Sequence, residues 1–354
     1  MVAARLAVDD YASKLGVPVE IISADHQNKP DVGAAIARRW FDTEDVDVAM
    51  DLPNSAVALA VLAVAEEKNK AAIGSGAGSS VLTGPKCSKN FVQWTYDTYS
   101  SGTALGKALT EAGGKTWFFV TADYAFGKDL EANCAAAVTA AGGKVLGSVR
   151  HPINTPDFSS FLLQAQGSAA DVVAFANGGG DTNGCFKQAH EFGLTPKQKL
   201  AGFTLNVTNI PALGLDIVQG ALLPTAFYWD ADDGTRSFGK RFLAAHPKKM
   251  MPNDMHAGVY GATAHLLKAF AETKSAADGA RLVEAMKAIP TDDPLFGKGS
   301  IRVDGRTVHP IYLYRAKAPS ESKYDWDDFE LVSTIKAEDA FRPLDKGGCP
   351  FVKA

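Results

Sequence analysis

Two hydrophobic patterns alternate along the chain. Short apolar runs between turn residues are typical of buried parallel strands, whereas apolar residues three or four apart are typical of helices that cover a sheet. The runs predict strands at residues 17–23, 46–50, 71–75, 116–121, 144–149, 172–176, 199–203, 221–227 and 311–315. The helical spacing predicts helices at residues 2–14, 31–41, 55–67, 127–141, 158–166, 235–245, 256–273 and 277–289, with another that ends near residue 191. This alternation predicts an α/β fold, followed by an irregular tail from residue 317.

The strands and helices fall into two series with the same rhythm. In each series a strand rich in Asp and Val, at residues 45–48 or 171–173, ends in a small polar loop that opens a helix. Ligands of parallel α/β sheets bind at the carboxyl ends of strands, near helix N-termini. The chain has 354 residues, more than one typical core. We therefore predict two lobes with a ligand cleft between them.

The composition argues against several classes of partner and cofactor, namely nucleic acids, membranes and zinc. The net charge of -4 and the scattered basic residues do not favour nucleic-acid binding. No apolar run reaches the roughly 20 residues of a membrane span. None of the four cysteines lies in a zinc-binding spacing, so we expect neither a metal nor another cofactor. The residues leave open whether these cysteines are free thiols or form one or two disulfides, which would indicate an oxidising compartment.

The loop at residues 74–79 reads Gly-Ser-Gly-Ala-Gly-Ser and invites a nucleotide interpretation. It lacks the last glycine of the dinucleotide fingerprint and the lysine of a phosphate-binding P-loop. We favour a loop whose free N–H groups hold a carboxylate. Asn54 and Ser55 follow the preceding strand, where each can cap a helix, contact a ligand, or do both.

Catalytic constellations are not evident in the sequence. His26, His256 and His309 have no metal-ligand or acid–base spacing with carboxylates, and no serine lies in a nucleophile-elbow motif. Aromatic residues gather at predicted loops, where they suit stacking on an apolar or aromatic solute. These residues are Trp94, Tyr96, Tyr99, Tyr124, Phe126, Tyr228 and Trp229.

Several stretches taken together resemble a known family. They lie at residues 4–10 (Ala-Arg-Leu-Ala-Val-Asp-Asp), 25–31 (Asp-His-Gln-Asn-Lys-Pro-Asp), 123–127 (Asp-Tyr-Ala-Phe-Gly), 156–160 (Pro-Asp-Phe-Ser-Ser) and 227–230 (Phe-Tyr-Trp-Asp). In their order and spacing the chain resembles the type I periplasmic solute-binding proteins of the branched-chain amino acid ABC transporter family. More narrowly, it is similar to the branch that binds aromatic and other organic acids.

The resemblance implies two Rossmann-like lobes with parallel-rich sheets, joined by three hinge crossovers near Gly114, Tyr228 and His309. Lobe one would comprise residues 1–114 and 228–308, and lobe two residues 115–227 and 309–354. The implied function is that of an extracytoplasmic solute-binding protein, not an enzyme. It would close on its solute in the periplasm, as a monomer, and present itself to the permease subunits of an ABC uptake transporter.

The resemblance also implies ligand contacts. Carried over position by position, they fall on Asn54, Ser55, Gly76, Ala77, Gly78, Ser79, Tyr99, Tyr124, Phe126, Gly178, Thr204, Leu205 and Tyr228. The acidic residue that holds an α-ammonium group in the family should fall near Thr204 or Leu205, where this chain has none. We therefore expect a small organic carboxylate with an apolar or aromatic body. The alternatives are an amino-acid or amide ligand, a regulatory sensor of the same fold, and a nucleotide-dependent α/β enzyme.

Two further expectations follow from the resemblance. Family members begin with a signal peptide and a first strand, whereas this sequence starts inside the first helix, so we expect an upstream strand and leader. Without that strand, lobe one would expose a sheet edge. For the cysteines, we expect Cys87 to pair with Cys349 and pin the tail, and Cys134 to pair with Cys185.

Overall fold

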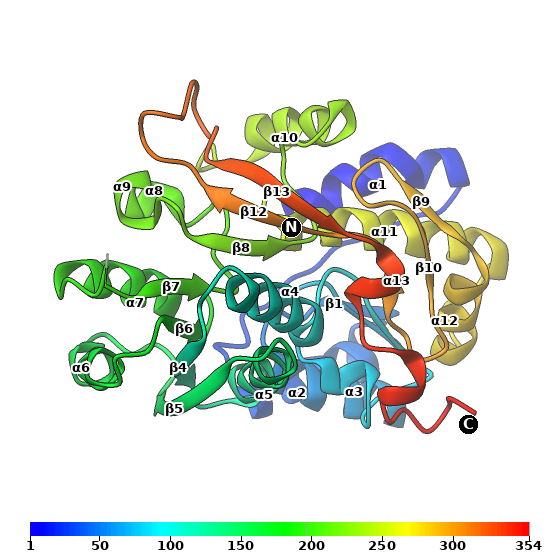
Figure 1. The fold of residues 1–354 in the computed structure, drawn as a ribbon. Coiled ribbons are helices and arrows are strands. Elements are labelled where there is room, and N and C mark those ends of the chain that lie inside the picture. Colours follow the sequence, from blue (N-terminus) through cyan, green and yellow to red (C-terminus); the bar gives the residue numbers. More distant parts are fainter. Residues whose placement is uncertain (196, 354) are drawn as a thin grey trace. The chain divides into compact units, whose positions relative to one another are not determined.

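The computed structural model describes residues 1–195 and 197–353, which divide into two compact units (Figure 1). Unit 1 combines Met1–Asp97, Ala226–Pro310 and the segment from Ala337 onward, and unit 2 combines Thr98–Thr225 and Ile311–Lys336. The chain therefore passes between the units after Asp97, Thr225, Pro310 and Lys336, whereas we expected three crossovers, near Gly114, Tyr228 and His309.

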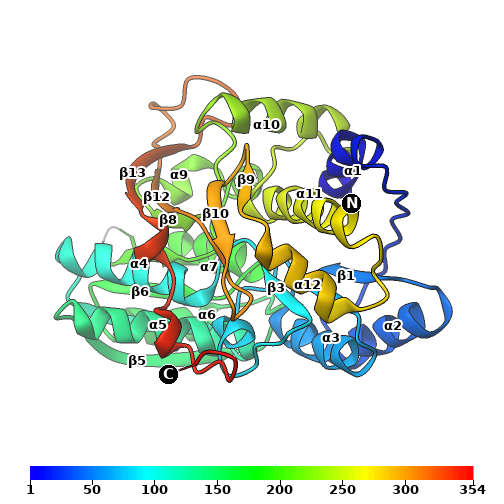
Figure 2. The same cartoon turned by 90° about the vertical axis from the view of Figure 1, so that its right-hand side faces the viewer.

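Unit 1 is built on a parallel sheet with the strand order β1-β2-β3. Its strands are β1 (Val48–Asp51), β2 (Ala71–Gly74) and β3 (Phe91–Gln93). Figure 2 shows β1 between the helices α2 (Pro30–Thr43) and α3 (Ser55–Glu67) on one face and α11 (Asp254–Thr273) and α12 (Gly279–Ala288) on the other. The remaining elements are α1 (Val2–Leu15), η1 (Ser80–Thr83), α10 (Asp233–Ala245), β9 (Thr291–Asp293), β10 (Gly297–Ile301), β11 (Thr307–Val308), α13 (Ala337–Ala340) and η2 (Leu344–Lys346).

A large cavity interrupts the core of unit 1 beside β1. Its volume is about 1110 Å³, whereas well-packed interiors contain few voids larger than one water molecule. One apolar cluster, which includes Ala49, Val57 and Val61, belongs to β1, α2 and α3. A separate cluster around Leu267 belongs to α1 and α11. Residues from both clusters line the cavity, so it divides what would otherwise be one core.

The predicted strand at residues 17–23 is wrong. These residues form no strand, and no backbone hydrogen bond joins residues 18–24 to another described residue. Val19 and Ile22 remain about two-fifths exposed, at 38% and 40%. A strand needs a neighbour for its N–H and C=O groups. The cavity separates this segment from β1, the nearest sheet edge that could supply one.

Unit 2 has a four-stranded parallel sheet in the order β5-β4-β6-β7. The strands are β4 (Thr116–Ala122), β5 (Lys144–His151), β6 (Val172–Ala176) and β7 (Lys199–Gly202). Every residue of β6 is buried, as expected of a parallel strand covered on both faces. The helices are α4 (Thr98–Glu111), α5 (Ala125–Ala140), α6 (Ser159–Gly167), α7 (Gly180–Glu191), α8 (Ile210–Leu213) and α9 (Leu215–Val218).

Helix α4, which the apolar pattern does not predict, packs tightly against α5. A side chain at Gly102 would come within 2.9 Å of the Cys134 backbone, and one at Gly106 within 3.1 Å of the Cys134 sulfur. The two glycines therefore allow a close approach that larger residues would prevent. This contact is the physical reason why residues 98–111 belong to unit 2, although we expected them in lobe one.

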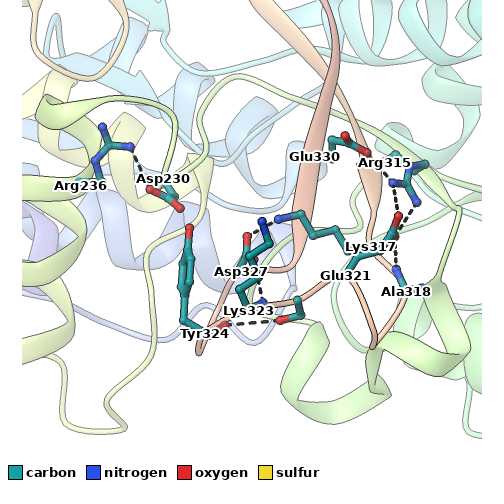
Figure 3. A network of polar contacts seen from close by, with 11 residues as sticks. Asp230, Arg236, Arg315, Lys317, Ala318, Glu321, Lys323, Tyr324, Asp327 and Glu330 are labelled. Carbon is teal, nitrogen blue, oxygen red and sulfur yellow. Dashed lines mark hydrogen bonds and ion pairs between the residues drawn. The ribbon is translucent and has the colours of Figure 1, made fainter.

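An antiparallel sheet completes unit 2 and corrects the prediction of an irregular tail. β12 (Ile311–Ala316) pairs with β8 (Leu222–Thr225) on one side and with β13 (Phe329–Ile335) on the other. Ion pairs hold the connection from β12 to β13 (Figure 3). Arg315 bridges Glu321 at 2.9 Å and Glu330 at 2.5 Å, and Lys317 pairs with Asp327.

One of the two expected disulfides is present. Cys87 and Cys349 are bonded, with their Cα atoms 5.6 Å apart, and the bond ties the end of the chain to unit 1. The expected pairing of Cys134 with Cys185 is wrong, because both are free and fully buried. Cys134 packs against α4, and the Cys185 sulfur accepts a hydrogen bond from the Asn177 amide. Burial raises the pKa of both thiols, which makes them unreactive.

Candidate functional site

The loop that follows β2 is held in place from several sides. Gln93 donates from its side-chain amide to the carbonyl oxygens of Ala77 (2.8 Å) and Ser79 (3.0 Å). The Tyr96 hydroxyl donates to the carbonyl of Gly76 at 3.2 Å. The N–H groups of Ser75 and Gly76 donate to the Asp51 carbonyl. The loop is therefore a rigid, buried structure at the carboxyl ends of β1 and β2.

Two adjacent backbone donors in this loop remain unused. The Ser79 N–H donates to the Ser55 hydroxyl at 3.1 Å, but the N–H groups of Ala77 and Gly78 donate to no other described residue. Both residues are buried. Buried backbone donors are nearly always paired, so a free pair in a fixed loop is well suited to receive an anion.

Asn54 and Ser55 support the same loop region. The Asn54 side chain caps α3 by accepting from the N–H groups of Ala56 (2.9 Å) and Val57 (3.1 Å). The Ser55 oxygen accepts from Ser79, which leaves its own proton for another acceptor. The N-terminus of α3 adds partial positive charge at this point, which also favours a bound anion. The loop is followed by the short 3₁₀ turn η1, and not by the long helix that follows the phosphate-binding loop of a nucleotide site.

Asp51, which ends β1, is not among the ligand contacts that the resemblance implies. Its backbone has φ 77°, and the side chain is partly buried. Burial raises its pKa to about 6. A side chain at Gly76 would stand 3.2 Å from an Asp51 carboxylate oxygen, so the acid lies directly beside the loop. The sequence could have indicated this residue, because Asp51 directly follows the predicted strand at residues 46–50 and precedes the loop Leu-Pro-Asn.

In unit 2, polar residues at the ends of β6 and β7 satisfy one another. The Thr204 hydroxyl donates to the Asn177 carbonyl at 3.0 Å and lies 2.8 Å from the Thr182 hydroxyl. Thr182 also lies 3.1 Å from the Asn177 side-chain oxygen. Leu205 is only 1% exposed and belongs to the core. Gly178 is partly buried, and a methyl group there would find only Thr204 nearby, at 3.7 Å.

Tyr124 and Phe126 lie at the end of β4, where α5 begins. Their ring centroids are 6.0 Å apart, and Gly127 brings the helix close to the sheet, since a side chain there would meet the Ala122 carbonyl at 2.2 Å. Burial, and the negative charge of Asp181, raise the pKa of Tyr124. Tyr124 is partly buried and Phe126 almost fully buried.

Asp181, at the start of α7, is a second acidic residue that the sequence reasoning missed. Its two oxygens accept from the N–H groups of Asn154 (3.1 Å) and Thr155 (3.0 Å). Burial raises its pKa in spite of these bonds. The Asp181 side chain therefore fixes the loop after β5.

The thirteen expected contact residues thus fall into two sets. Unit 1 holds Asn54, Ser55, Gly76, Ala77, Gly78, Ser79 and the buried Tyr228, and unit 2 holds Tyr99, Tyr124, Phe126, Gly178, Thr204 and Leu205. Six of the unit 1 residues form one continuous constellation around α3 and the β2 loop. We refer to that constellation, residues 54–55 and 76–79, as the anion loop.

Residues 1–195 and 197–353 contain no group of three or more His, Cys, Asp or Glu side chains that could hold a metal ion. None of the helices described has both the length and the apolar character required to cross a bilayer. In parallel α/β sheets, polar groups at the carboxyl ends of strands are the usual place for a small solute, and each unit has such groups.

Comparison with known proteins identifies the family. A family model described as periplasmic binding protein matches residues 1–323, and the chain belongs to this family. Its members are solute-binding proteins and not enzymes; they bind small organic acids or amino acids and work with the permeases of ABC transporters. The family is extracytoplasmic.

Solved structures agree with this assignment. A periplasmic binding protein from Burkholderia mallei is 43% identical, with 99% of this chain and 93% of that chain covered and a TM-score of 0.95. A branched chain amino acid ABC transporter periplasmic ligand-binding protein from Burkholderia xenovorans is 39% identical, with the same coverage and a TM-score of 0.85. A solute binding protein from R. palustris in complex with benzoate is 21% identical, covers 95% and 92%, has a TM-score of 0.84, and shares the fold.

Proposed function

We propose that this chain is the periplasmic solute-binding component of an ABC uptake transporter, and that its solute is a small organic carboxylate, with an apolar or aromatic body. The free N–H groups of Ala77 and Gly78 are the observation that carries the proposal. A carboxylate accepts two such donors readily, and hydrogen bonds to a charged acceptor are stronger than neutral ones. The benzoate bound by the R. palustris protein is a solute of this class.

We propose that the solute's body contacts the unit 2 residues Tyr124 and Phe126, and that the protein closes on it by hinge motion. Their rings provide an apolar surface with one hydroxyl. The polar groups at the ends of β6 and β7 are engaged with each other, whereas the anion loop has two free N–H donors for a carboxylate. The disulfide between Cys87 and Cys349 supports the periplasmic location, because such bonds persist in oxidising compartments.

The test is isothermal titration of the purified protein with benzoate, 4-hydroxybenzoate and leucine. We expect an aromatic carboxylate to bind more tightly than leucine. Gly78→Pro removes one N–H donor and should weaken carboxylate binding by about 10-fold or more, since a hydrogen bond to a charged group contributes about 1.5–3 kcal/mol. Gly78→Ala keeps the N–H and is the matched control. Equal affinities of the two folded variants would contradict the proposed role of this loop.

A branched-chain amino acid remains the second candidate because of Asp51. This carboxylate lies beside the anion loop, and the described chain offers it no ion-pair partner. An α-ammonium group could therefore find a counter-charge in unit 1, although no acidic residue adjoins Thr204 or Leu205 in the sequence. If leucine binds more tightly than every aromatic acid tested, and Asp51→Asn abolishes that preference, the second candidate replaces the first.

A further inference from the structure

Arg306 is a buried cation that donates to three backbone carbonyl groups. Its side chain is fully buried. The Nη1 and Nη2 atoms donate to the carbonyl oxygens of Tyr96, at 2.9 Å, and of Trp94, and Nε donates to that of Thr307 at 2.8 Å. Burial lowers the pKa of Arg306 to about 10, so the guanidinium group keeps its charge at neutral pH. A buried charge costs more free energy than an apolar side chain, so the arginine is best explained by the groups that it holds in place.

Two of the three carbonyl groups belong to residues 93–96, the segment in which β3 ends. The Trp94 N–H donates to the Gly74 carbonyl of β2 at 2.9 Å, whereas the Trp94 carbonyl accepts from Arg306. Gln93 pairs with Arg306 itself in an isolated parallel bridge. The backbone of this segment is therefore fixed by β2 and by Arg306 together.

Two side chains of this segment reach the anion loop. The Tyr96 hydroxyl donates to the Gly76 carbonyl at 3.2 Å, and the Gln93 side-chain amide donates to the Ala77 carbonyl at 2.8 Å. A peptide bond is planar and trans, so the carbonyl of one residue and the N–H of the next point in opposite directions from one rigid group. The two carbonyl groups thus share their peptide groups with the N–H of Ala77 and the N–H of Gly78. Holding the carbonyl groups sets the directions of these two N–H groups, which remain unused in the loop.

The same two hydrogen bonds also make the N–H groups better donors. A peptide group whose carbonyl oxygen accepts a hydrogen bond is polarised, which strengthens the hydrogen bond that its N–H can donate. The gain is largest for a charged acceptor, because charge-assisted hydrogen bonds are about twice as strong as neutral ones. Fixed direction and polarisation therefore both favour an anion over a neutral solute at this loop.

We propose that Gln93 and Tyr96 are positioning residues of the anion loop, and that Arg306 fixes the backbone from which both side chains act. Together they aim the N–H groups of Ala77 and Gly78 at a bound carboxylate, and they act through the loop rather than by contact with the solute. The identity of the anion rests on the proposed function, whereas the orientation of the two peptide groups belongs to the loop alone.

The first test measures the loop without a ligand. Tyr96→Phe removes one hydroxyl group and keeps the ring, and Gln93→Met removes the amide at similar size. In ¹H–¹⁵N spectra, the nitrogen of a peptide group responds to a hydrogen bond at the carbonyl of the same group. We expect Tyr96→Phe to shift the Ala77 nitrogen and Gln93→Met to shift the Gly78 nitrogen. Unshifted nitrogens in both variants would overturn the inference.

The second test is calorimetric titration of the same two variants with benzoate and with benzamide, which has one carbonyl oxygen and no charge. Each variant should bind benzoate about 3- to 10-fold more weakly, the range expected for one lost hydrogen bond. Benzamide binding should weaken less than about 2-fold, because its hydrogen bonds to the loop have no charge assistance. A purely structural role would weaken both ligands equally, and equal losses would therefore contradict the inference.

Arg306→Lys tests the anchor of the segment. Lysine keeps the positive charge but lacks the planar fork that reaches two carbonyl groups. The variant should shift both loop nitrogens and weaken benzoate binding more than benzamide binding. Unchanged nitrogens and unchanged affinity would show that Arg306 does not act on the loop.

Tyr260→Phe is the matched control, because it removes a hydroxyl group that donates to Asp10 at 2.7 Å elsewhere in unit 1. It should leave the loop nitrogens and the benzoate affinity unchanged. If the unaltered protein binds no carboxylate while the nitrogens of the variants shift as expected, the proposed function fails and the positioning of the N–H groups stands. If benzoate binds but the nitrogens do not shift, the positioning alone fails.

Discussion

Unit 1 and unit 2 repeat the same strand–helix rhythm, but their parallel sheets end differently. In unit 2, β4 has a parallel neighbour on each side, β5 and β6, and its side chains are almost all buried. In unit 1, β1 has β2 on one side and the cavity of about 1110 Å³ on the other. The two strands have a similar apolar pattern but different neighbours. An apolar strand therefore becomes part of a closed core only where another strand pairs with each of its edges.

The two units also differ in how many polar groups at their strand ends remain without a hydrogen-bond partner. Asn177, Thr182 and Thr204 of unit 2 satisfy one another's hydrogen bonds. In the anion loop of unit 1, the carbonyl groups of Gly76, Ala77 and Ser79 accept hydrogen bonds, but the N–H groups of Ala77 and Gly78 stay free. Polar groups that are already paired offer a ligand few new hydrogen bonds. Unpaired donors in a rigid loop can each form one when a ligand binds.

The largest expected change in unfolding free energy comes from truncating a buried leucine side chain to alanine in each unit. Leu130 on α5 is fully buried in unit 2, and Leu267 on α11 is 4% exposed but borders the unit 1 cavity. Leu130→Ala should cost about 3–5 kcal/mol of unfolding free energy. Leu267→Ala should cost less, about 1–2 kcal/mol, because fewer contacts surround it. Urea unfolding measures both, and equal losses would refute the proposed difference in packing.

Reduction of the disulfide should destabilise unit 1 selectively. The bond between Cys87 and Cys349 closes a loop of 262 residues, and loss of such a bond costs about 2–4 kcal/mol. Thermal unfolding with and without reductant should show a lower midpoint for the unit 1 transition only. The double variant Cys87→Ser/Cys349→Ser is the control, and its midpoint should not respond to reductant. A shift of the unit 2 transition would argue against independent units.

The pH dependence of unit 1 should change when Asp51 is neutralised. Its folded pKa, about 6, lies above the ordinary value of 3.8, so the folded state binds more protons between these pH values and loses stability as pH rises through them. Asp51→Asn should therefore gain about 1–3 kcal/mol at pH 7 and nothing below pH 4. Denaturant unfolding across pH tests this. Asp45→Asn, at an exposed residue that also has positive φ, should show no such gain.

The smallest effect is expected at the ion pairs of the β12–β13 connection. Arg315 pairs with Glu321 and Glu330, and all three side chains are substantially exposed, at 31%, 43% and 56%. Arg315→Met should change the unfolding free energy by about 1 kcal/mol or less, since water and salt screen such pairs. Unfolding in low and high salt measures it. A loss above about 2 kcal/mol would show that the connection matters more for unit 2 than its exposure indicates.

The sequence predicted helices and strands best where an apolar pattern reflects a buried face. The expected helix at residues 55–67 and the expected strand at residues 172–176 agree with α3 and β6 to the residue. α4 was missed because its Ser, Gly and Thr content disfavours a helix locally, and contact with α5 stabilises it. β13 was missed because five of its seven residues are exposed, so its sequence lacks an apolar run.

The sequence by itself determined the α/β class, the rhythm of the two units and the position of the anion loop, because periodicity and helix-opening residues act over short distances. Only the tertiary structure decided which loop groups are paired, since Gln93 and Tyr96 donate to loop carbonyl groups and Ser55 accepts from the Ser79 N–H, all from distant positions. It likewise decided that residues 17–23 form no strand and that Cys134 stays away from Cys185. Hydrogen bonds and disulfides depend on which segments meet in space, and a local pattern does not specify that.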